Sequence, residues 1–298
     1  MIRVIRCHPS RVEALVAFVA AHNSAPEHHI GYLGLTPEDI RDSLRAFPAP
    51  FARAMRLAVA GGRIVGACGA DQDAAIGRAW LYGPLVAAAP WDATADALYA
   101  ALVADLPPAI GQHEMFVDSA NARCRAFAAR HGFHPAGESS IYTLPAARLD
   151  ALPPAAAGPW DERYAPQLAA LHERLFPGSN YTVDYMRREW AERGAILLLI
   201  TEGEALRGYF FGHAPPHTGE GYVDLIGVDE SCRRAGLGRR LMLAGLRQMR
   251  GTPGLAQVAL TVAAGNAAAR ALYDDLGFTL EREMIAFRRA VALQEENQ

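Results

Sequence analysis

The sequence predicts an α/β (α+β) protein built from two similar units in tandem, each with a mixed, mostly antiparallel sheet flanked by helices. Three observations lead to this prediction. A strand, a helix and a turn recur 145 positions apart, and a Pro- and Ala-rich stretch at 144–160 separates the two copies. The length of 298 residues is also about twice that of a common domain of roughly 100–150 residues.

The repeat is clearest near the end of each half. Each copy reads as a strand, an Asn suited to capping a helix N-terminus, about ten helical residues, and a Gly that ends the helix in the left-handed conformation. Because the spacing is the same across all these elements, the match covers a whole supersecondary unit. The corresponding pairs are Asn121 and Asn266, Arg125 and Arg270, Gly132 and Gly277, and Phe133 and Phe278.

Hydrophobic spacing predicts the remaining elements of both copies. Helices come first, strands follow, and helices alternate with strands only in the later part. We therefore expect antiparallel pairing at the start of each sheet and parallel pairing where helices cross over. The first copy begins with helices at 11–21 and 37–46, and the second copy contains helices at 164–175 and 182–192, strands at 195–201, 206–213 and 221–228, helix 237–249, strand 257–262, helix 267–276 and a strand near 283–288.

The Pro- and Ala-rich stretch between the copies suits a linker and not a strand or a long helix. A hydrophobic fraction of 51% with 20% charged residues is ordinary for a packed protein, so each half can bury a core. We expect an N-terminal domain at 1–146, a linker at 147–156 and a C-terminal domain at 157–298.

Charge and cysteine usage exclude several classes of function. The net charge is 29 − 32 = −3, so no global field attracts nucleic acid or an anionic membrane, and any anion site is local. The four cysteines lie far apart, without the spacing of a zinc site. No stretch approaches the roughly eighteen apolar residues of a membrane span. We expect a cytoplasmic protein without a metal, acting as a monomer or homodimer.

One loop has the features of a phosphate site. It follows the apolar strand 221–228, opens an amphipathic helix, and reads Arg233-Arg234-Ala235-Gly236-Leu237-Gly238. A helix N-terminus presents free backbone N–H groups and the positive end of the helix dipole. The glycines allow backbone conformations closed to other residues, and the two arginines add charge and hydrogen-bond donors.

Other known phosphate loops do not fit this segment. A Walker loop requires Gly-Lys-Ser/Thr and a dinucleotide loop requires Gly-x-Gly-x-x-Gly, and neither is present here. The pattern Arg-x-x-Gly-x-Gly after a strand instead resembles the pyrophosphate loop of the GCN5-related N-acetyltransferase (GNAT) superfamily. Asn266, Tyr273 and Gly277-Phe278 resemble that family's next strand–helix unit. The resemblance covers about 140 residues at the C-terminal end and, through the repeat, the first half more loosely.

The resemblance implies an acetyl-CoA-dependent N-acetyltransferase that moves an acetyl group directly to a primary amine in the C-terminal domain. Acetyl-CoA is expected in a cleft between two parallel strands that splay apart. Its pyrophosphate would lie on the loop, and the acceptor would be a small-molecule or protein amine. The residues expected to bind the cofactor are Ile226, Gly227, Val228, Arg233, Arg234, Ala235, Gly236, Leu237, Gly238, Arg239, Asn266 and Tyr273.

Tyr273 matches the family position of the acid that protonates the leaving thiolate. A phenol with a pKa of about 10 stays protonated at neutral pH, and it is close enough to a thiol of about 8.5 to donate. The alternative is an aromatic side chain that packs on the helix face or only hydrogen-bonds coenzyme A.

Asp224 is the expected general base. It shares one face of its strand with Tyr222 by period-two alternation, at positions where relatives carry Glu or His bases, and burial would raise its pKa. The alternative is a strand carboxylate held by a neighbouring Arg or a backbone amide. The N–H groups around Gly227 and Val228 are the expected oxyanion donors.

Contacts to the acceptor are expected from Phe176, Tyr181 and Tyr222. The loop 176–181 falls where the family often builds its acceptor pocket, and Tyr222 lies beside Asp224 on the strand. His213 and His217 flank a Pro-Pro turn and are interpreted as loop residues and not as metal ligands.

The first copy lacks the phosphate loop. The matching stretch 83–96 has neither arginine nor paired glycines, and Ala128 stands in the place of Tyr273. Asp92 or Thr94 is expected to cap the next helix, and Asp92 with Asp96 would repel a pyrophosphate. We therefore expect a degenerate domain that supports the C-terminal one.

Two other functions remain open at this point. One is a non-catalytic acyl-CoA-binding or sensing protein that kept the loop but lacks a working base. The other is a module that binds a different nucleotide through the same loop.

Overall fold

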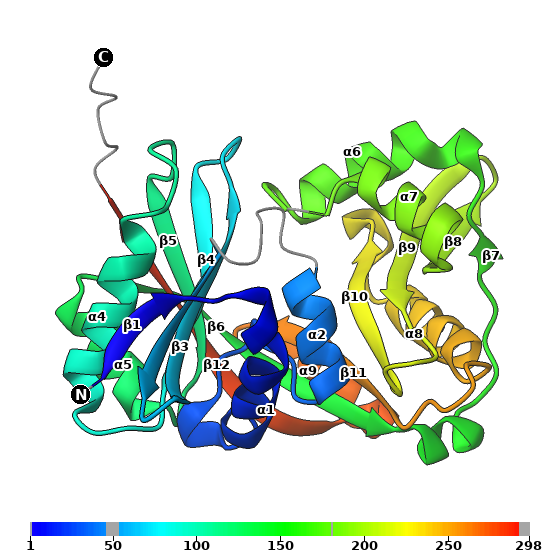
Figure 1. Cartoon of the computed structure of the whole chain (residues 1–298). Coiled ribbons are helices and arrows are strands. Elements are labelled where there is room, and N and C mark those ends of the chain that lie inside the picture. Colours follow the sequence, from blue (N-terminus) through cyan, green and yellow to red (C-terminus); the bar gives the residue numbers. More distant parts are fainter. Residues whose placement is uncertain (1, 46–53, 180, 292–298) are drawn as a thin grey trace. The chain divides into compact units, whose positions relative to one another are not determined.

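The computed structural model describes residues 2–45, 54–179 and 181–291 (Figure 1). Contacts divide the chain into two compact units. Unit 1 contains the described residues up to Ser139 and those from Arg282 onward, and unit 2 contains Ser140–Glu281. Ala46 and Asn180, which fall in a predicted helix and in the predicted acceptor loop, lie outside the described residues.

The elements of unit 1 are β1 (Arg3–Arg6), α1 (Val12–His22), α2 (Pro37–Arg45), β2 (Met55–Ala60), β3 (Arg63–Asp73), β4 (Arg78–Val86), α4 (Trp91–Val103), β5 (Gln112–Asp118), α5 (Ala122–Arg130) and most of β12 (Thr279–Ala290). Their strand order is β1-β2-β3-β4-β5-β12. The paired strands are antiparallel except β4 and β5, which are parallel. Helix α4 packs on β2, β3 and β4.

The elements of unit 2 are the end of β6 (His134–Pro145), β7 (Gly158–Pro159), α6 (Ala165–Leu175), α7 (Val183–Arg193), β8 (Ile196–Glu202), β9 (Ala205–His213), β10 (Glu220–Val228), α8 (Leu237–Met249), β11 (Gln257–Ala263) and α9 (Ala267–Leu276). Their strand order is β6-β11-β10-β9-β8-β7. Strands β8, β9 and β10 pair antiparallel, and β10 pairs parallel with β11. The predicted mixed sheet is therefore confirmed.

The helix and strand bounds agree closely with the sequence pattern. Helices α8 and α9 begin and end at the predicted residues, and the bounds of the other predicted elements agree to within one residue where the structure describes them. The last strand is the exception, because it extends from Thr279 to Ala290. Local periodicity thus places the elements well, while the length of the last strand depends on its partners.

The recurring strand–helix–turn unit has the same local chemistry in both copies. The Asn121 Oδ1 atom accepts a hydrogen bond from Cys124 N–H at 3.0 Å, and Asn266 Oδ1 accepts one from Ala269 N–H at 3.2 Å. Gly132 and Gly277 then adopt φ of 70° and 87°, a left-handed conformation that glycine adopts without steric cost. The predicted caps and stops of α5 and α9 are confirmed.

The sheet of unit 2 has apolar side chains on both faces. On one face, Phe210 packs with residues of α8 such as Leu241 and Met242. On the other, Tyr209 and Phe211 pack with residues of α6 such as Leu168. Because strand side chains alternate between faces, α8 covers one side of the sheet and α6 and α7 cover the other (Figure 1).

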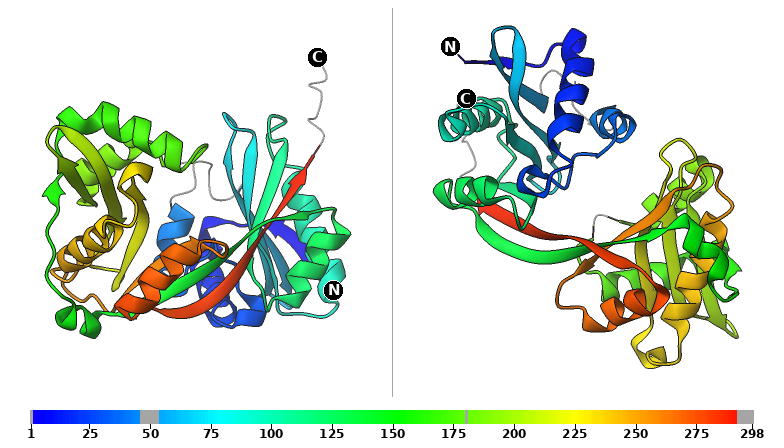
Figure 2. Two further views of the ribbon diagram at one scale, coloured as in Figure 1. Left: turned by 180° about the vertical axis from the view of Figure 1, so that it is seen from behind. Right: turned by 90° about the horizontal axis from the view of Figure 1, so that it is seen from below.

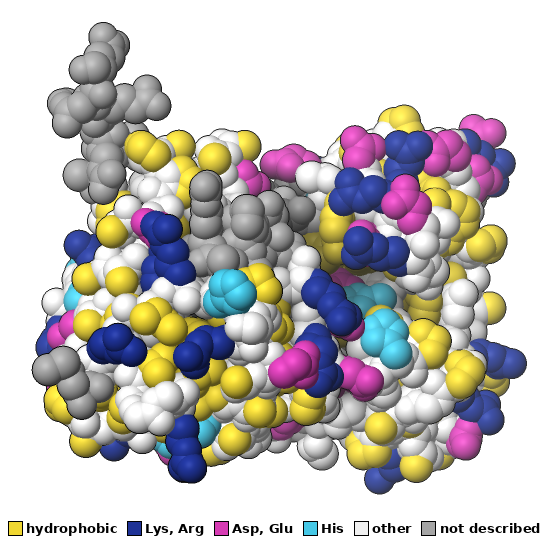
Figure 3. Space-filling model, in the orientation of Figure 1, with side chains coloured by type: hydrophobic (Ala, Val, Ile, Leu, Met, Phe, Trp, Pro, Cys, Tyr) yellow, Lys and Arg dark blue, Asp and Glu magenta, His cyan; other side chains and the backbone are white. Residues whose placement is uncertain are grey.

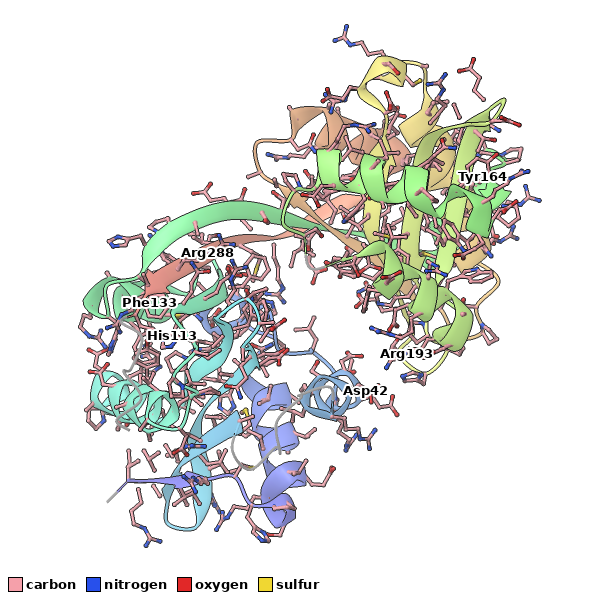
Figure 4. All side chains as sticks on the ribbon, turned by 90° about the horizontal axis from the view of Figure 1, so that it is seen from above. Asp42, His113, Phe133, Tyr164, Arg193 and Arg288 are labelled. Atoms are coloured by element: carbon pink, nitrogen blue, oxygen red, sulfur yellow. The ribbon has the colours of Figure 1, made fainter. Side chains whose placement is uncertain are left out.

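The last strand returns to the first unit. Strand β12 pairs antiparallel with β5, from Met284 opposite Asp118 to Ala290 opposite Gln112. Figure 2 shows β12 in red, leading away from the orange helix α9, and Figure 4 labels Arg288 on it. The sequence pattern assigned all of 157–298 to the C-terminal domain, whereas the structure places the residues from Arg282 onward in unit 1.

The Pro- and Ala-rich stretch takes part in the structure of unit 2. Residues Ala146–Ala151 form a 3₁₀ helix, and Leu149 is buried in the core on the α8 side of the sheet. Gly158 and Pro159 pair with β8. The residues expected to form a linker at 147–156 therefore contribute a buried side chain.

Gly245 lies where α8 packs on β9. A Cβ atom there would lie less than 3.0 Å from the buried Phe210 ring. Gly to Ala in an unobstructed helix stabilises by about 1 kcal/mol. We expect Gly245→Ala instead to lower the free energy of unfolding by about 1–3 kcal/mol, because the ring must move from its packed position. Urea unfolding followed by circular dichroism measures this change.

Gly265→Ala is the matched control for this prediction. No described atom lies within 4 Å of the place where a Cβ atom of Gly265 would stand. Its stability should stay close to that of the wild type. A Gly245→Ala protein at least as stable as the wild type would contradict the close packing of α8 on β9.

Candidate active site

The loop between β10 and α8 leaves the helix N-terminus open. Arg234 and Gly236 have φ of 64° and 75°, and they turn the chain so that α8 begins at Leu237. Gly236 is exposed, and no described atom lies within 4 Å of the place where its Cβ atom would stand. Arg234 in this conformation carries a strain of about 1–3 kcal/mol, as is common at ligand-binding loops.

Backbone N–H groups at this turn are available to a ligand. Arg233 N–H donates to the Glu230 carbonyl, and the next donor is Arg240 N–H, which bonds the Gly236 carbonyl at 3.0 Å. Within the described part of the chain, the amides of residues 234–239 between them have no hydrogen-bond partner. Such unpaired amides at a helix N-terminus bind anions.

The ion pairs that the described structure shows for the arginines around the loop are exposed. Arg233 bonds Glu230 at 2.8 Å, three residues earlier, and Arg239 pairs with Asp275 of α9. Arg234 is exposed. Exposed pairs of this kind contribute little to stability, so an anionic ligand can replace either carboxylate as partner.

Beside the loop, β10 and β11 separate. Their pairing runs only from Glu220 with Gln257 to Val223 with Leu260. Beyond Val223, the β11-facing edge of β10 has no strand partner in the described structure. The expected splayed pair of parallel strands is therefore present.

The direction of the N–H groups on the open edge follows from one hydrogen bond. Asp229 N–H donates to the Arg207 carbonyl of β9 at 2.8 Å. Because successive N–H groups of a strand point to opposite edges, Val228 N–H points to the open edge and Gly227 N–H points to β9. Val228, and not Gly227, thus presents its amide to the space between the strands.

Gly227 has a packing role. A Cβ atom there would lie less than 3.0 Å from the Tyr209 ring and 2.9 Å from Leu175. Only glycine therefore allows α6 and β9 to approach β10 at this point.

Tyr273 lies in α9 and is 9% exposed. Its ring packs near Tyr142 and Phe278, at centroid distances of 6.1 and 5.9 Å. Burial raises the pKa of Tyr273 to about 12. The phenol therefore stays protonated at neutral pH, as a proton donor must.

Asp224 is held by two side chains. Its Oδ1 atom accepts a hydrogen bond from the Tyr181 hydroxyl at 2.9 Å, and its Oδ2 atom lies 2.8 Å from His213 Nδ1. The Asp224 side chain is 2% exposed, whereas that of His213 is 46% exposed. The partners are thus a Tyr and a His, and not the Arg or backbone amide considered from the sequence.

His213 is a residue of this site that the sequence reasoning missed. It ends β9 opposite Tyr222, and the two rings stack with centroids 6.0 Å apart. Partial desolvation would lower the pKa of His213, but the hydrogen bond and the charge of Asp224 raise it above the usual value. The alternation of Tyr209, Phe211 and His213 along β9 was the available signal, since it places all three on one face.

The predicted acceptor residues lie on the same face of the sheet. The hydroxyl of Tyr222 lies 2.6 Å from Thr261 Oγ1 of β11, across the end of the paired region. Tyr181 packs edge-to-face with Tyr185 and Phe211. Phe176 is half-buried and lies beside His172, at 5.5 Å between ring centroids. The structure therefore brings Tyr181 and Tyr222 to Asp224, while Phe176 packs against the core.

The remaining predicted residues lie around the open helix end. Ile226 and Val228 are partly buried on the α8 side of β10. Leu237 is half-buried, and Ala235 is exposed. Asn266 is exposed and uses its Oδ1 atom to cap α9.

Unit 1 differs at the matching place. Helix α4 begins at Trp91 after Pro90, with no side-chain cap, so the expected caps from Asp92 or Thr94 are absent. The Thr94 hydroxyl instead donates to the Pro90 carbonyl at 2.8 Å. Asp92 and Asp96 both pair with Arg130 of α5. The helix end that would face a phosphate is thus followed by paired acidic side chains.

The described residues can be checked for a metal site and for a membrane-spanning helix. In them, no group of three or more His, Cys, Asp or Glu side chains could hold a metal ion. None of their helices combines the length and the apolar character needed to cross a bilayer. On the right-hand part of the face drawn in Figure 3, basic and acidic side chains are interspersed.

Comparison with known families identifies the class of the second half. Residues 165–278 match the model of the acetyltransferase (GNAT) family. This segment contains the open helix end, the splayed strands, Asp224 and Tyr273. Residues 165–278 therefore form a domain of the GNAT family.

Curated relatives match part of the chain. It is 38% identical over 110 residues to mycothiol acetyltransferase from Segniliparus rotundus, which is 35% of this chain and 40% of that protein. It is 52% identical over 68 residues to mycothiol acetyltransferase from Streptosporangium roseum, 23% of this chain and 19% of that protein. The matches thus span less than half of these relatives.

Solved structures share the fold of nearly the whole chain. A GCN5-related N-acetyltransferase from Sphaerobacter thermophilus has a TM-score of 0.72 at 17% identity, covering 97% of this chain and 95% of that one. A tandem GNAT protein from the clavulanic acid biosynthesis pathway has a TM-score of 0.69 at 19% identity, covering 97% and 98%. The tandem GNAT fold therefore extends over both units.

The pairing of His213 with Asp224 makes a direct prediction. In Asp224→Asn the negative charge beside the ring is lost while its desolvation remains, so the pKa of His213 should fall below its wild-type value. A ¹H–¹⁵N NMR titration of the imidazole nitrogens measures this change, with His217 as the reference histidine in the same samples. An unchanged His213 titration in Asp224→Asn would show that the two side chains are not coupled.

Proposed function

We propose that unit 2 binds acetyl-CoA and transfers its acetyl group to the primary amine of a small molecule. The observation that carries this proposal is the open N-terminus of α8 beside the free edge of β10. Neither the amides of 234–239 nor this edge has a hydrogen-bond partner among the described residues. The match of residues 165–278 to the GNAT model and the acetyltransferase names of the partial relatives support it.

The loop fits the diphosphate of coenzyme A. Several amides converge at the helix N-terminus, and Arg233, Arg234 and Arg239 lie in or next to the loop, so two negative charges can be hydrogen-bonded and neutralised together. The open edge of β10 at 226–228 can bond the amides of the pantetheine arm as an added strand would. Both contacts use backbone groups that have no other partner in the described residues.

The transfer forms a bond from the amine nitrogen to the acetyl carbon and breaks the bond from that carbon to sulfur. Val228 N–H, on the open edge, is the proposed donor to the oxygen that gains charge. Tyr273 is the proposed acid for the departing thiolate, since its buried phenol is protonated at neutral pH.

Gly238 tests the diphosphate site. A Cβ atom there would meet Val228 and Leu272 only at 3.9 Å, so Gly238→Asp should fold normally. Its carboxylate would repel the diphosphate, and we expect the Kd for acetyl-CoA to rise on the order of 100-fold, or about 2.7 kcal/mol. Isothermal titration calorimetry measures this affinity. Gly238→Ala, which adds the Cβ atom without charge, should keep most of this affinity. Equal Kd values for the wild type and both variants would show that acetyl-CoA does not bind at the loop.

Tyr273 tests the chemical step. Tyr273→Phe keeps the packed ring and removes the proton donor, so kcat should fall by about 10²–10⁴-fold, the usual contribution of a general acid. The Kd for acetyl-CoA should stay within a few-fold. Release of free thiol from acetyl-CoA measures kcat, with glucosamine, spermidine, lysine and a short peptide as acceptors. An unchanged kcat would show that Tyr273 is not the proton donor and only packs in the core.

The same assay separates the other two functions. Tight binding of acetyl-CoA without turnover of any of these amines would favour a sensor. A rise in melting temperature with ATP or NAD, and none with acetyl-CoA, would favour a different nucleotide.

A further inference from the structure

Three side chains form a chain of hydrogen bonds on the face of β9 and β10 that α6 and α7 cover. The Tyr181 hydroxyl donates to Asp224 Oδ1 at 2.9 Å, and Asp224 Oδ2 lies 2.8 Å from His213 Nδ1. The side chains come from the segment before α7, from β10 and from the end of β9. These hydrogen bonds therefore connect a buried carboxylate with an imidazole at the surface.

Asp224 is poorly placed to meet a substrate. Both of its oxygens are engaged, and only 2% of its side chain is exposed. The bulge between Val223 and Leu225 turns it towards Tyr181, on the covered side of the sheet. With 2% of its side chain exposed, this carboxylate offers little surface to a substrate amine.

His213 has the opposite properties. Its side chain is 46% exposed. The hydrogen bond at Nδ1 requires a proton there, because Asp224 is an acceptor when ionised. The Nε2 atom is then the unprotonated, accepting nitrogen, and it has no hydrogen-bond partner among the described residues. A carboxylate that fixes the tautomer and orientation of an exposed imidazole is the arrangement that general bases use.

We propose that His213 Nε2 accepts the proton of the acceptor amine, and that Asp224 acts as a positioning residue that orients the ring and stabilises its protonated form. This inference rests on the acetyl transfer proposed for unit 2. It reassigns the role of general base from Asp224, expected from the sequence, to a residue on the neighbouring strand.

The surrounding charges suit a cationic acceptor. Besides Asp224, the carboxylates of Glu189 on α7 and Glu220 on β10 act on His213. Glu189 is paired with Arg193 at 3.4 Å, and Arg188 lies over the Tyr185 ring at 5.6 Å. Burial raises the pKa of Tyr222, beside the imidazole, to about 12, so this phenol adds no charge. The carboxylates favour both the approach of an ammonium group and the imidazolium that forms.

The proton balance closes with the groups present. An acceptor that arrives as an ammonium group first loses one proton to water. The neutral amine nitrogen then attacks the acetyl carbon and loses its second proton to His213 Nε2. The carbon–sulfur bond breaks, and the thiolate takes one proton from Tyr273. His213 ends protonated and Tyr273 ends ionised, so exchange with water returns both groups to their starting states.

The test compares His213→Gln, Asp224→Asn and His217→Gln with the wild type, using acetyl-CoA and the best acceptor of the amine panel. Gln can donate to Asp224 but cannot accept the amine proton, so His213→Gln should lower kcat by about 10²–10⁴-fold. Its Kd for acetyl-CoA and its melting temperature should stay close to those of the wild type. His217→Gln, at the exposed histidine four residues further along, should keep the wild-type kcat.

The pH dependence separates a catalytic role from a structural one. In the wild type, kcat at saturating acceptor should rise with pH as His213 loses its proton, with a midpoint above the usual histidine value because Asp224 raises the pKa of His213. In Asp224→Asn this limb should move to lower pH. In His213→Gln it should disappear, and free imidazole should restore part of the rate to His213→Ala.

The possible outcomes separate a failure of the proposed acetyl transfer from a failure of the proposed role of His213. If the wild type releases no thiol with any amine, the proposed acetyl transfer fails. If the wild type is active but His213→Gln keeps its kcat and its pH profile, the transfer stands and the role of His213 is refuted. Loss of activity with an unchanged pH limb in Asp224→Asn would refute the positioning role of Asp224.

Discussion

The site depends on one departure from regular sheet pairing. Strands β10 and β11 run together for four residue pairs and then separate. Within the described part of the chain, this separation leaves backbone groups of β10 without a partner. Such groups cost free energy unless water or a ligand satisfies them. Helix α8 begins beside that edge, and buried residues such as Leu241 and Met242 fix its position. The unpaired strand edge and the unpaired helix end therefore stay where the packing puts them.

The bulge at Asp224 adds polar chemistry to this edge. It lies just beyond Val223, the last residue of β10 paired with β11, and it places Asp224 and Leu225 on the same side of the sheet. Unit 1 has a comparable irregularity, between Ala67 and Gly69 of β3 opposite Gly83 and Pro84. There Pro84 has no N–H group, and its carbonyl accepts a hydrogen bond from the buried Cys124 thiol. The irregularity in unit 2 thus carries a carboxylate, and the one in unit 1 does not.

The sequence predicted what depends on local pattern. The helices and strands follow from side-chain periodicity, and the turn at Gly236 follows from the need for a left-handed residue before α8. Alternation along β9 places His213 on the face of Tyr209 and Phe211. Its contact with Asp224 could not be predicted, because it depends on the register between β9 and β10. The partner of β12 could not be predicted either, because the side-chain pattern of a strand does not specify which other strand it pairs with.

The return of the last strand affects how the chain is made and divided. During translation, unit 1 emerges first, but β5 has an unpaired edge until residues 282–290 leave the ribosome. Until then the backbone N–H and C=O groups of Gln112–Asp118 on this side lack their β12 partners, and an exposed strand edge of this kind invites association with other chains. A fragment that ends near residue 146 lacks the strand that pairs with this edge. The first unit, which looks separable in the sequence, is therefore complete only when residues 282–290 are present.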